Sequence, residues 1–152
     1  MTPVTANSVA DFFLCFCREH GDVVTHLKLQ KLLYYAQAWH LALKKKPLFD
    51  EPIEAWVHGP VVRSVYRRFR ECHGDPISLK SAKPELGPAV EKHLTEVFSA
   101  YGRYSAWDLE RMTHQEEPWQ KARKGLNPDE EGKSEIARQH MTDFYRALAA
   151  SK

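Results

Sequence analysis

Hydrophobic residues recur at helical spacing over most of the chain. The clearest case is the stretch 88–101, where apolar side chains fall at i, i+4, i+7, i+8 and i+11, the pattern of a helix with one apolar face. A longer helix is predicted to start after Thr25, which can cap it, and to end before Pro47. Shorter helices are predicted to begin at serines that can act as N-caps, namely Ser8, Ser105 and Ser134, and another is predicted to end at Gly125.

The stretch 53–69 changes from a strand pattern to a helix pattern. Its first six residues alternate between apolar and polar, which predicts an extended strand with Trp56 and His58 on its more polar side. Gly59 supplies a flexible backbone position, and Pro60 suits the first turn of a helix, where its missing N–H costs no hydrogen bond. We therefore predict a strand that passes directly into a helix at these two residues.

The helix predicted after Pro60 carries two stripes of side chains. The apolar stripe, which is expected to pack, consists of Val62, Val65, Tyr66 and Phe69. The basic stripe consists of Arg63, Arg67 and Arg70. Because guanidinium groups pair with carboxylates and with phosphates, the basic stripe is a candidate contact for an acidic protein surface or for nucleic acid. A solvated helix face is the simpler alternative.

These patterns predict a mainly α, compact single domain over residues 1–152, with six to seven helices and a small two-stranded β element. The second strand is predicted at 77–79, a short alternating run that would pair with 53–57. A two-stranded ribbon is marginal by itself, so it has to lie against the helices. The length of 152 residues and the hydrophobic content of 43% suit one folded domain.

Charge and cysteine content narrow the class of protein. The chain has 22 basic and 20 acidic residues, so it has no strong overall attraction for nucleic acid. Its three cysteines, Cys15, Cys17 and Cys72, form no CxxC pair, which argues against a disulfide framework or a zinc site and fits a reducing cytoplasm. A basic leader and a long apolar run are both missing, so we expect no export signal and no membrane span.

Catalytic and metal-binding patterns are also missing from the sequence. The eight histidines show no HExxH or HxH spacing, and the glycines form no phosphate-binding loop. Cys15 and Cys17 lie in a Phe-rich stretch, where a buried cysteine is usually a packing residue. We therefore expect a protein that is not an enzyme and that needs no cofactor or metal. A hydrolase that uses His58 or His114 is the alternative, and it would need a nucleophile nearby in the fold.

Three sequence blocks resemble the Panacea domain, the SocA-like antitoxin family that is also labelled phage-associated or GepA-type protein. The blocks are 27–39, 53–66 and 113–119, the last followed by Ala122, and they occur in the family's order. The family's motif residues fall here at Trp56, His58, Gly59, Pro60, Val61, Tyr66, Thr113, His114, Pro118 and Trp119. His58 stands where the family commonly has an aromatic residue, and Arg63 stands where it commonly has a proline.

The resemblance implies a mainly helical, cytoplasmic antitoxin of a type II-like toxin–antitoxin system, carried by a bacterium or a prophage. Its implied partner is a cognate toxin protein encoded by an adjacent gene, and its implied action is direct protein contact. Delivery of the toxin to a cytoplasmic protease, as in one relative, is a second implied route. Because Arg63 extends the basic stripe, we expect the partner surface to include Arg63, Arg67, Arg70 and Trp56. A nucleic-acid-binding regulator that uses these arginines is the alternative function.

Overall fold

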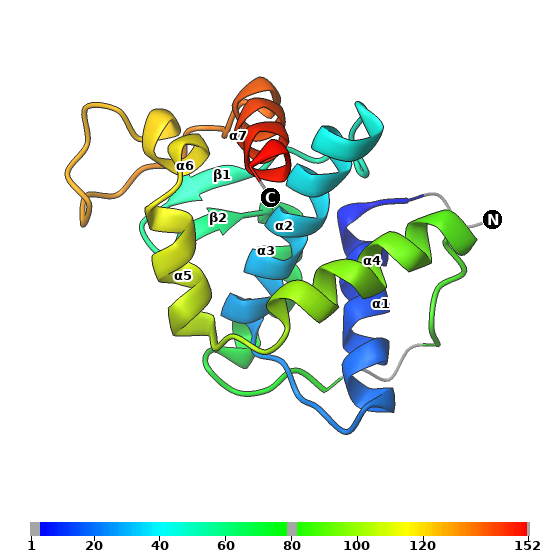
Figure 1. Cartoon of the computed structure of the whole chain (residues 1–152). Helices are drawn as coiled ribbons and strands as arrows, with labels where there is room; N and C mark the ends of the chain where they lie inside the picture. The colour runs from blue at the N-terminus through cyan, green and yellow to red at the C-terminus, as the bar shows by residue number, and fades with distance from the viewer. Residues whose placement is uncertain (1–3, 79–81, 152) are drawn as a thin grey trace.

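The computed structural model describes residues 4–78 and 82–151. In this part of the chain it contains seven α-helices, one 3₁₀ turn and one two-stranded antiparallel sheet (Figure 1). The elements in order are α1 (Ala6–Glu19), α2 (His26–Lys44), β1 (Glu54–Trp56), β2 (Gly59–Val61), α3 (Arg63–Phe69), η1 (Arg70–Cys72), α4 (Pro88–Tyr101), α5 (Ala106–His114), α6 (Glu117–Ala122) and α7 (Arg138–Ala150). The predicted mainly α fold with a small two-stranded β element is confirmed.

Helix α2 lies at the centre of the molecule, with α1 and α4 on one side, α5 on the other and α7 across it (Figure 1). Its side chains are buried around almost the whole circumference, including the polar residues Gln30, Lys31 and Gln37. A helix enclosed in this way needs no single apolar stripe, because every face meets another element. The predicted cap is confirmed, since Thr25 accepts a hydrogen bond from the backbone N–H of Lys28.

The predicted passage from strand to helix at Gly59 and Pro60 is wrong. These residues form β2, in which Gly59 lies opposite Trp56 and Pro60 lies opposite Ala55. The chain therefore makes a tight hairpin, and α3 begins only at Arg63. No hairpin signal is present at this turn, because its residues are Val57 and His58, without the Asn-Gly or Asp-Gly pair that usually marks such a turn.

The predicted pairing of 77–79 with 53–57 is also wrong. The N–H of Ile77 donates to the carbonyl of Val24 at 2.9 Å, so this segment runs beside the connection that precedes α2. Leu79 lies outside the described residues. The free side of β1 is instead taken by a segment near the C-terminus, where Ala55 N–H donates to the carbonyl of Ser134 at 2.8 Å.

Two of the predicted helix caps are wrong. Helix α1 is capped by Thr5, whose side chain accepts a hydrogen bond from the N–H of Ser8 while the Ser8 hydroxyl accepts one from Thr5 N–H. Ser8 is therefore the second member of a capping box. Ser134 lies in the extended segment beside β1, and α7 begins at Arg138. The predicted cap at Ser105 is confirmed.

The hydrophobic core surrounds α2 and includes the cysteines of α1. Cys15 and Cys17 are buried, as expected for packing residues, and both are free thiols. Burial raises the pKa of Cys17 to about 11, so its thiol stays protonated at neutral pH. Among the helices of the described residues, none combines the length and the apolar character that crossing a bilayer requires.

Candidate functional site

The hairpin of β1 and β2 rests on Lys31 of α2. The Lys31 side chain is fully buried, and its Nζ donates to the carbonyl of Pro60 at 3.4 Å. Gly59 lies against the same side chain with φ at 109°, and a Cβ there would come within 2.6 Å of Lys31 Cε and 3.1 Å of Thr113 Oγ1. Both the backbone angle and the available space therefore require glycine at position 59.

A carboxylate of α5 links the buried Lys31 to the exposed turn of the hairpin. Burial lowers the pKa of Lys31 to about 7, and the charge of Glu110 opposes this shift. Glu110 Oε1 also lies 3.2 Å from Nδ1 of His58, whose side chain is 73% exposed. This pair meets one requirement of a hydrolase, but none of the described residues that line the adjacent pocket is Ser, Thr or Cys.

Gln30 of α2 fixes the chain between β2 and α3. The N–H of Val62 donates to Gln30 Oε1 at 2.8 Å, and Gln30 Nε2 donates to the Val62 carbonyl at 3.3 Å. With the amide oriented in this way, Gln30 Nε2 also donates to Nε2 of His26 at 3.0 Å. Burial, followed by the charge of Lys31, lowers the pKa of His26 to about 4. His26 is therefore neutral at pH 7 and carries its proton on Nδ1.

The third sequence block supports the hairpin from the side of α6. Trp119 is 6% exposed, and its Nε1 donates to the carbonyl of Trp56 at 2.9 Å. His114 stacks on Trp119 with ring centroids 4.0 Å apart. Arg123 is also buried, and its Nη1 donates to the carbonyl of Ala55 at 3.0 Å. The hydrogen bonds from Trp119 and Arg123 therefore hold the backbone of β1 in place.

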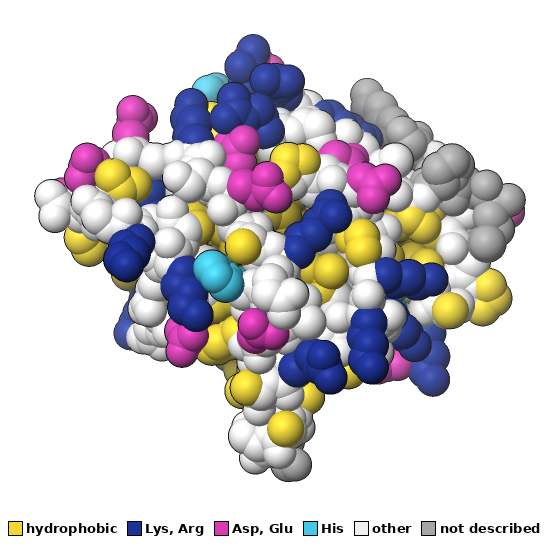
Figure 2. Space-filling view, turned by 90° about the horizontal axis from the view of Figure 1, so that it is seen from above, with side chains coloured by type: hydrophobic (Ala, Val, Ile, Leu, Met, Phe, Trp, Pro, Cys, Tyr) yellow, Lys and Arg dark blue, Asp and Glu magenta, His cyan; other side chains and the backbone are white. Residues whose placement is uncertain are grey.

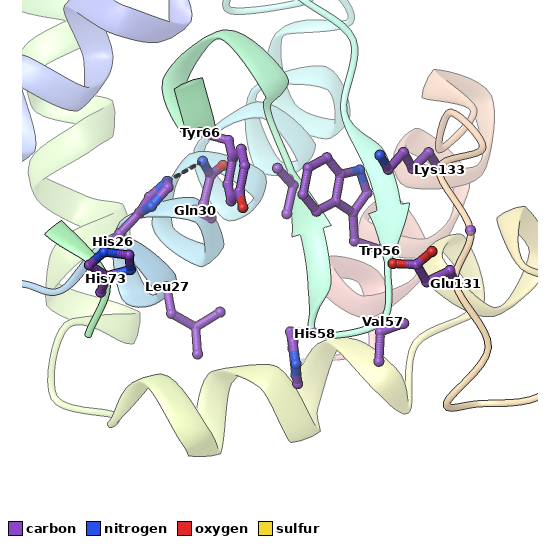
Figure 3. Close-up of a pocket in the computed structure, with 12 residues that line it drawn as sticks. His26, Leu27, Gln30, Trp56, Val57, His58, Tyr66, His73, Glu131 and Lys133 are labelled. Carbon is purple, nitrogen blue, oxygen red and sulfur yellow. Dashed lines mark hydrogen bonds between the residues drawn. The ribbon is translucent and has the colours of Figure 1, made fainter. Parts of the chain in front are cut away.

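A pocket of about 450 Å³ opens beside the hairpin (Figure 3). Its walls come from the start of α2, the hairpin, α3, the residue after η1 and the segment before α7. Leu27, Val57 and Val61 give it an apolar surface. Trp56 and Tyr66 meet edge to face in the wall, with ring centroids 4.8 Å apart. The motif residues Trp56, His58, Val61 and Tyr66 line this pocket, so it is the candidate binding site.

The three arginines of the predicted basic stripe differ in their surroundings. Arg63 binds Glu54 with two hydrogen bonds, from Nε at 3.2 Å and from Nη2 at 2.9 Å. Arg67 is exposed and makes no ion pair with any described residue. The side chain of Arg70 is 60% exposed and meets Glu71 only at 3.9 Å. Arg67 and Arg70 are therefore available for a partner, whereas Arg63 is engaged within the protein.

The other predicted site residues fall into two groups. Trp56, His58 and Tyr66 line the pocket. The buried group consists of Gly59 and Pro60 in the hairpin and of Thr113, Pro118 and Trp119 in α5 and α6. His114 is half-buried and stacks on Trp119. Across residues 4–78 and 82–151, no three His, Cys, Asp or Glu side chains are placed to hold one metal ion.

Sequence reasoning missed the buried polar residues that support the site, namely Gln30, Lys31, Glu110 and Arg123. It also missed the half-buried Glu116, which bonds to tyrosines of α2 and α7. For the two residues of α2 a signal existed, because Gln30 and Lys31 interrupt a run of leucines. Polar residues at such positions must find partners when they are buried. For Arg123 no local signal existed, because its acceptor at Ala55 is 68 positions away in the sequence.

One of these missed residues, Glu116, lies between α2 and α7. Its Oε1 accepts hydrogen bonds from the hydroxyls of Tyr34, at 3.0 Å, and Tyr145. Burial raises the pKa of Glu116 from 4.5 to about 7, although the tyrosine hydrogen bonds oppose the shift. The folded protein therefore holds this proton more tightly than the unfolded chain does.

Replacement of Glu116 with glutamine is expected to change how stability depends on pH. In the wild type, the contribution of Glu116 to the unfolding free energy is full below pH 4.5 and is lost as the pH rises to about 7. Glutamine keeps an acceptor oxygen and has no such loss, so Glu116→Gln should be more stable than the wild type at pH 8, by up to about 3 kcal/mol.

Urea unfolding followed by circular dichroism at pH 5 and pH 8 measures this difference. The neighbouring Glu117 pairs with Lys121 at the surface, so Glu117→Gln is a matched control and should show almost no pH-dependent change. If Glu116→Gln and Glu117→Gln give the same difference between the two pH values, the buried carboxylate does not control stability.

Comparison with known proteins gives the same family that the three blocks resemble. Residues 29–120 match the family model described as Antitoxin SocA-like, Panacea domain. Antitoxin SocA of Caulobacter vibrioides (strain NA1000 / CB15N) is 30% identical to the chain over 124 residues. The alignment covers 73% of this chain and 65% of that protein, so the chain spans less than two thirds of the relative's length. No solved structure matches the chain.

The matched residues coincide with the architecture of the site. The range 29–120 contains most of α2, the whole hairpin and α3 through α5, and therefore the Lys31, Gly59 and Thr113 cluster. The segment that pairs with the free side of β1 lies after the match. Because the match covers more than half of the chain, this protein belongs to the SocA-like antitoxin family that carries the Panacea domain.

Proposed function

We propose that this chain is a non-enzymatic antitoxin that binds and inactivates a toxin protein encoded by an adjacent gene. The observation that carries the proposal is the match of residues 29–120 to an antitoxin family. The proposal that the chain is not an enzyme is supported by its buried polar residues, because Gln30, Lys31 and Arg123 bond to the backbone of the hairpin and of the residue after it. Lys31, whose pKa of about 7 would suit a nucleophile, is fully buried and has no route to a substrate.

A protein partner suits the surface better than nucleic acid does. Nucleic-acid binding depends on several unpaired basic side chains along one face. The guanidinium group of Arg63 is already hydrogen-bonded to Glu54. Figure 2 shows that Lys, Arg, Asp and Glu side chains all occur across the face seen from above, with hydrophobic side chains visible between them. On this face, the mixture of both signs offers no continuous positive field for a phosphate backbone.

Coexpression with the adjacent gene tests the proposal. The product of that gene should slow or stop growth when expressed alone, and growth should recover when this chain is expressed with it. The two proteins should also copurify through a tag on either one. The proposal fails if the adjacent product is harmless alone and the two proteins never copurify.

The same experiment separates two routes of neutralisation. Direct blockade predicts that the amount of toxin stays constant or rises when the chain is present, because the complex protects it. Delivery to a protease predicts that the amount of toxin falls, and that it recovers in a strain without the protease. Immunoblots of the tagged toxin, after synthesis is stopped, measure this difference.

A further inference from the structure

The pocket beside the hairpin has two chemically different ends (Figure 3). His26 and His73 lie at one end, close to Tyr66. Glu131 and Lys133 lie at the other end, where the Lys133 ammonium group is 5.2 Å from the centre of the Trp56 ring. The apolar side chains of the pocket lie between these ends. A ligand that fits must therefore be apolar in the middle and polar at its edges.

The histidine end offers hydrogen-bond donors and no carboxylate among its described lining residues. His26 Nε2 is occupied by the Gln30 amide, so the proton on Nδ1 is a donor without an acceptor among the described residues. Tyr66 is half-buried, and its hydroxyl also makes no hydrogen bond to a described residue. The described carboxylate in the pocket wall, Glu131, is at the opposite end. Donors without acceptors favour an anionic group at the histidine end.

Arg70 adds positive charge just beyond the end of α3, outside the lining of the pocket. The side chains of Arg70 and Glu71 are 60% and 86% exposed. The Nε of Arg70 lies 3.9 Å from Oε1 of Glu71, which is a long distance for an ion pair. A solvent-exposed pair of this kind is weak, so Arg70 can exchange Glu71 for a carboxylate of a partner.

The size of the pocket suits a peptide side chain rather than a flat surface contact. A volume of about 450 Å³ lies within the range of pockets that enclose small organic ligands. Large apolar side chains that enter such pockets supply much of the affinity of protein interfaces. Trp56 and Tyr66 offer aromatic surface for stacking, and Leu27 and Val57 offer aliphatic surface.

We propose that this pocket is the docking site for the toxin, and that it takes a peptide segment in which an aromatic or branched aliphatic residue lies next to Asp or Glu. The apolar side chain fills the space between Leu27, Val57 and Trp56, and the carboxylate faces His26, His73 and Tyr66. The identity of the partner as a toxin rests on the proposed function, whereas the chemistry of the peptide rests on the pocket alone.

Selection of peptides from a random 12-residue display library against the intact chain tests the chemistry. Enriched peptides should carry an aromatic or branched aliphatic residue within two positions of Asp or Glu. Synthetic copies in which that acid is changed to its amide should bind about tenfold more weakly, because charge-assisted hydrogen bonds are lost. Enrichment of Lys-rich or Arg-rich peptides, or of no peptide, would overturn the proposal.

The substitution Leu27→Glu tests the position of the site. Glutamate suits the first turn of α2 and leaves the fold intact, but it places a negative charge on the apolar wall. Leu43→Glu is the matched control, because Leu43 is 56% exposed at the other end of the same helix. Binding of the selected peptides should fall at least about tenfold in Leu27→Glu and stay unchanged in Leu43→Glu. Equal binding to both variants would contradict a site at Leu27.

Coexpression of these variants with the adjacent gene keeps the two proposals apart. If the wild type and Leu43→Glu restore growth and Leu27→Glu does not, the toxin docks at the pocket. If all three restore growth, the docking site is wrong and the antitoxin function stands. If the wild type does not restore growth, the proposed function fails, and the peptide selection alone decides what the pocket binds. Circular dichroism of the variants shows whether each one is folded.

Discussion

Replacement of Gly59 with alanine is expected to lower the free energy of unfolding by about 3 kcal/mol or more. Two effects add at this position. Alanine at a φ of 109° is strained by its own backbone, and its Cβ would lie 2.6 Å from Lys31 Cε. Lys31 cannot move aside easily, because its side chain is fully buried and its Nζ holds the carbonyl of Pro60.

Gly125→Ala is the matched control for this variant. Gly125 has a similar φ of 92°, but nothing lies within 4 Å of a Cβ built there. In Gly125→Ala, backbone strain alone should therefore lower the unfolding free energy, by about 1–2 kcal/mol. Urea unfolding followed by circular dichroism gives both values. Equal losses in the two variants would mean that Lys31 does not restrict the space at Gly59.

Truncation of Trp119 to alanine is expected to cost about 3–5 kcal/mol of unfolding free energy, as for other buried tryptophans. The change removes the stack on His114 and the hydrogen bond to the Trp56 carbonyl, and it leaves a cavity beside β1. Trp119→Phe keeps most of the ring and loses the hydrogen bond, so its loss should be smaller. Thermal or urea unfolding of the three proteins measures the difference.

Trp107 provides the control for this series. It is 65% exposed on α5, so Trp107→Ala should change the unfolding free energy by no more than about 0.5 kcal/mol. If Trp107→Ala is as harmful as Trp119→Ala, burial does not explain the role of Trp119. If Trp119→Phe is as harmful as Trp119→Ala, the hydrogen bond to β1 contributes more than the packing of the ring.

The local helices of the fold could be predicted from the sequence, and its long-range pairings could not. The apolar spacing over 88–101 coincides with α4, and Thr25 caps α2 as predicted. Ser134, in contrast, has the local features of an N-cap, but its carbonyl accepts a hydrogen bond from Ala55 in β1. Nothing near Ser134 in the sequence indicates this partner, because strand pairing depends on residues that are distant along the chain.

The composition of the site was predictable only in part. The sequence points to Trp56, His58 and Tyr66, and all three line the pocket. It does not point to Arg123 or Lys31, although both contact the hairpin. Long basic side chains are usually exposed, and their burial depends on backbone carbonyls that the fold brings within reach. The sequence shows which residues are present but not which carbonyls will surround them.

Direct binding of a toxin is the central claim, and titration of the purified chain against the purified product of the adjacent gene tests it. Isothermal titration calorimetry should show a saturable complex of fixed stoichiometry, formed by the two proteins alone. That result would link the restored growth to contact between the proteins. Restored growth in cells without any complex in the calorimeter would contradict the claim, and it would point instead to control of toxin synthesis.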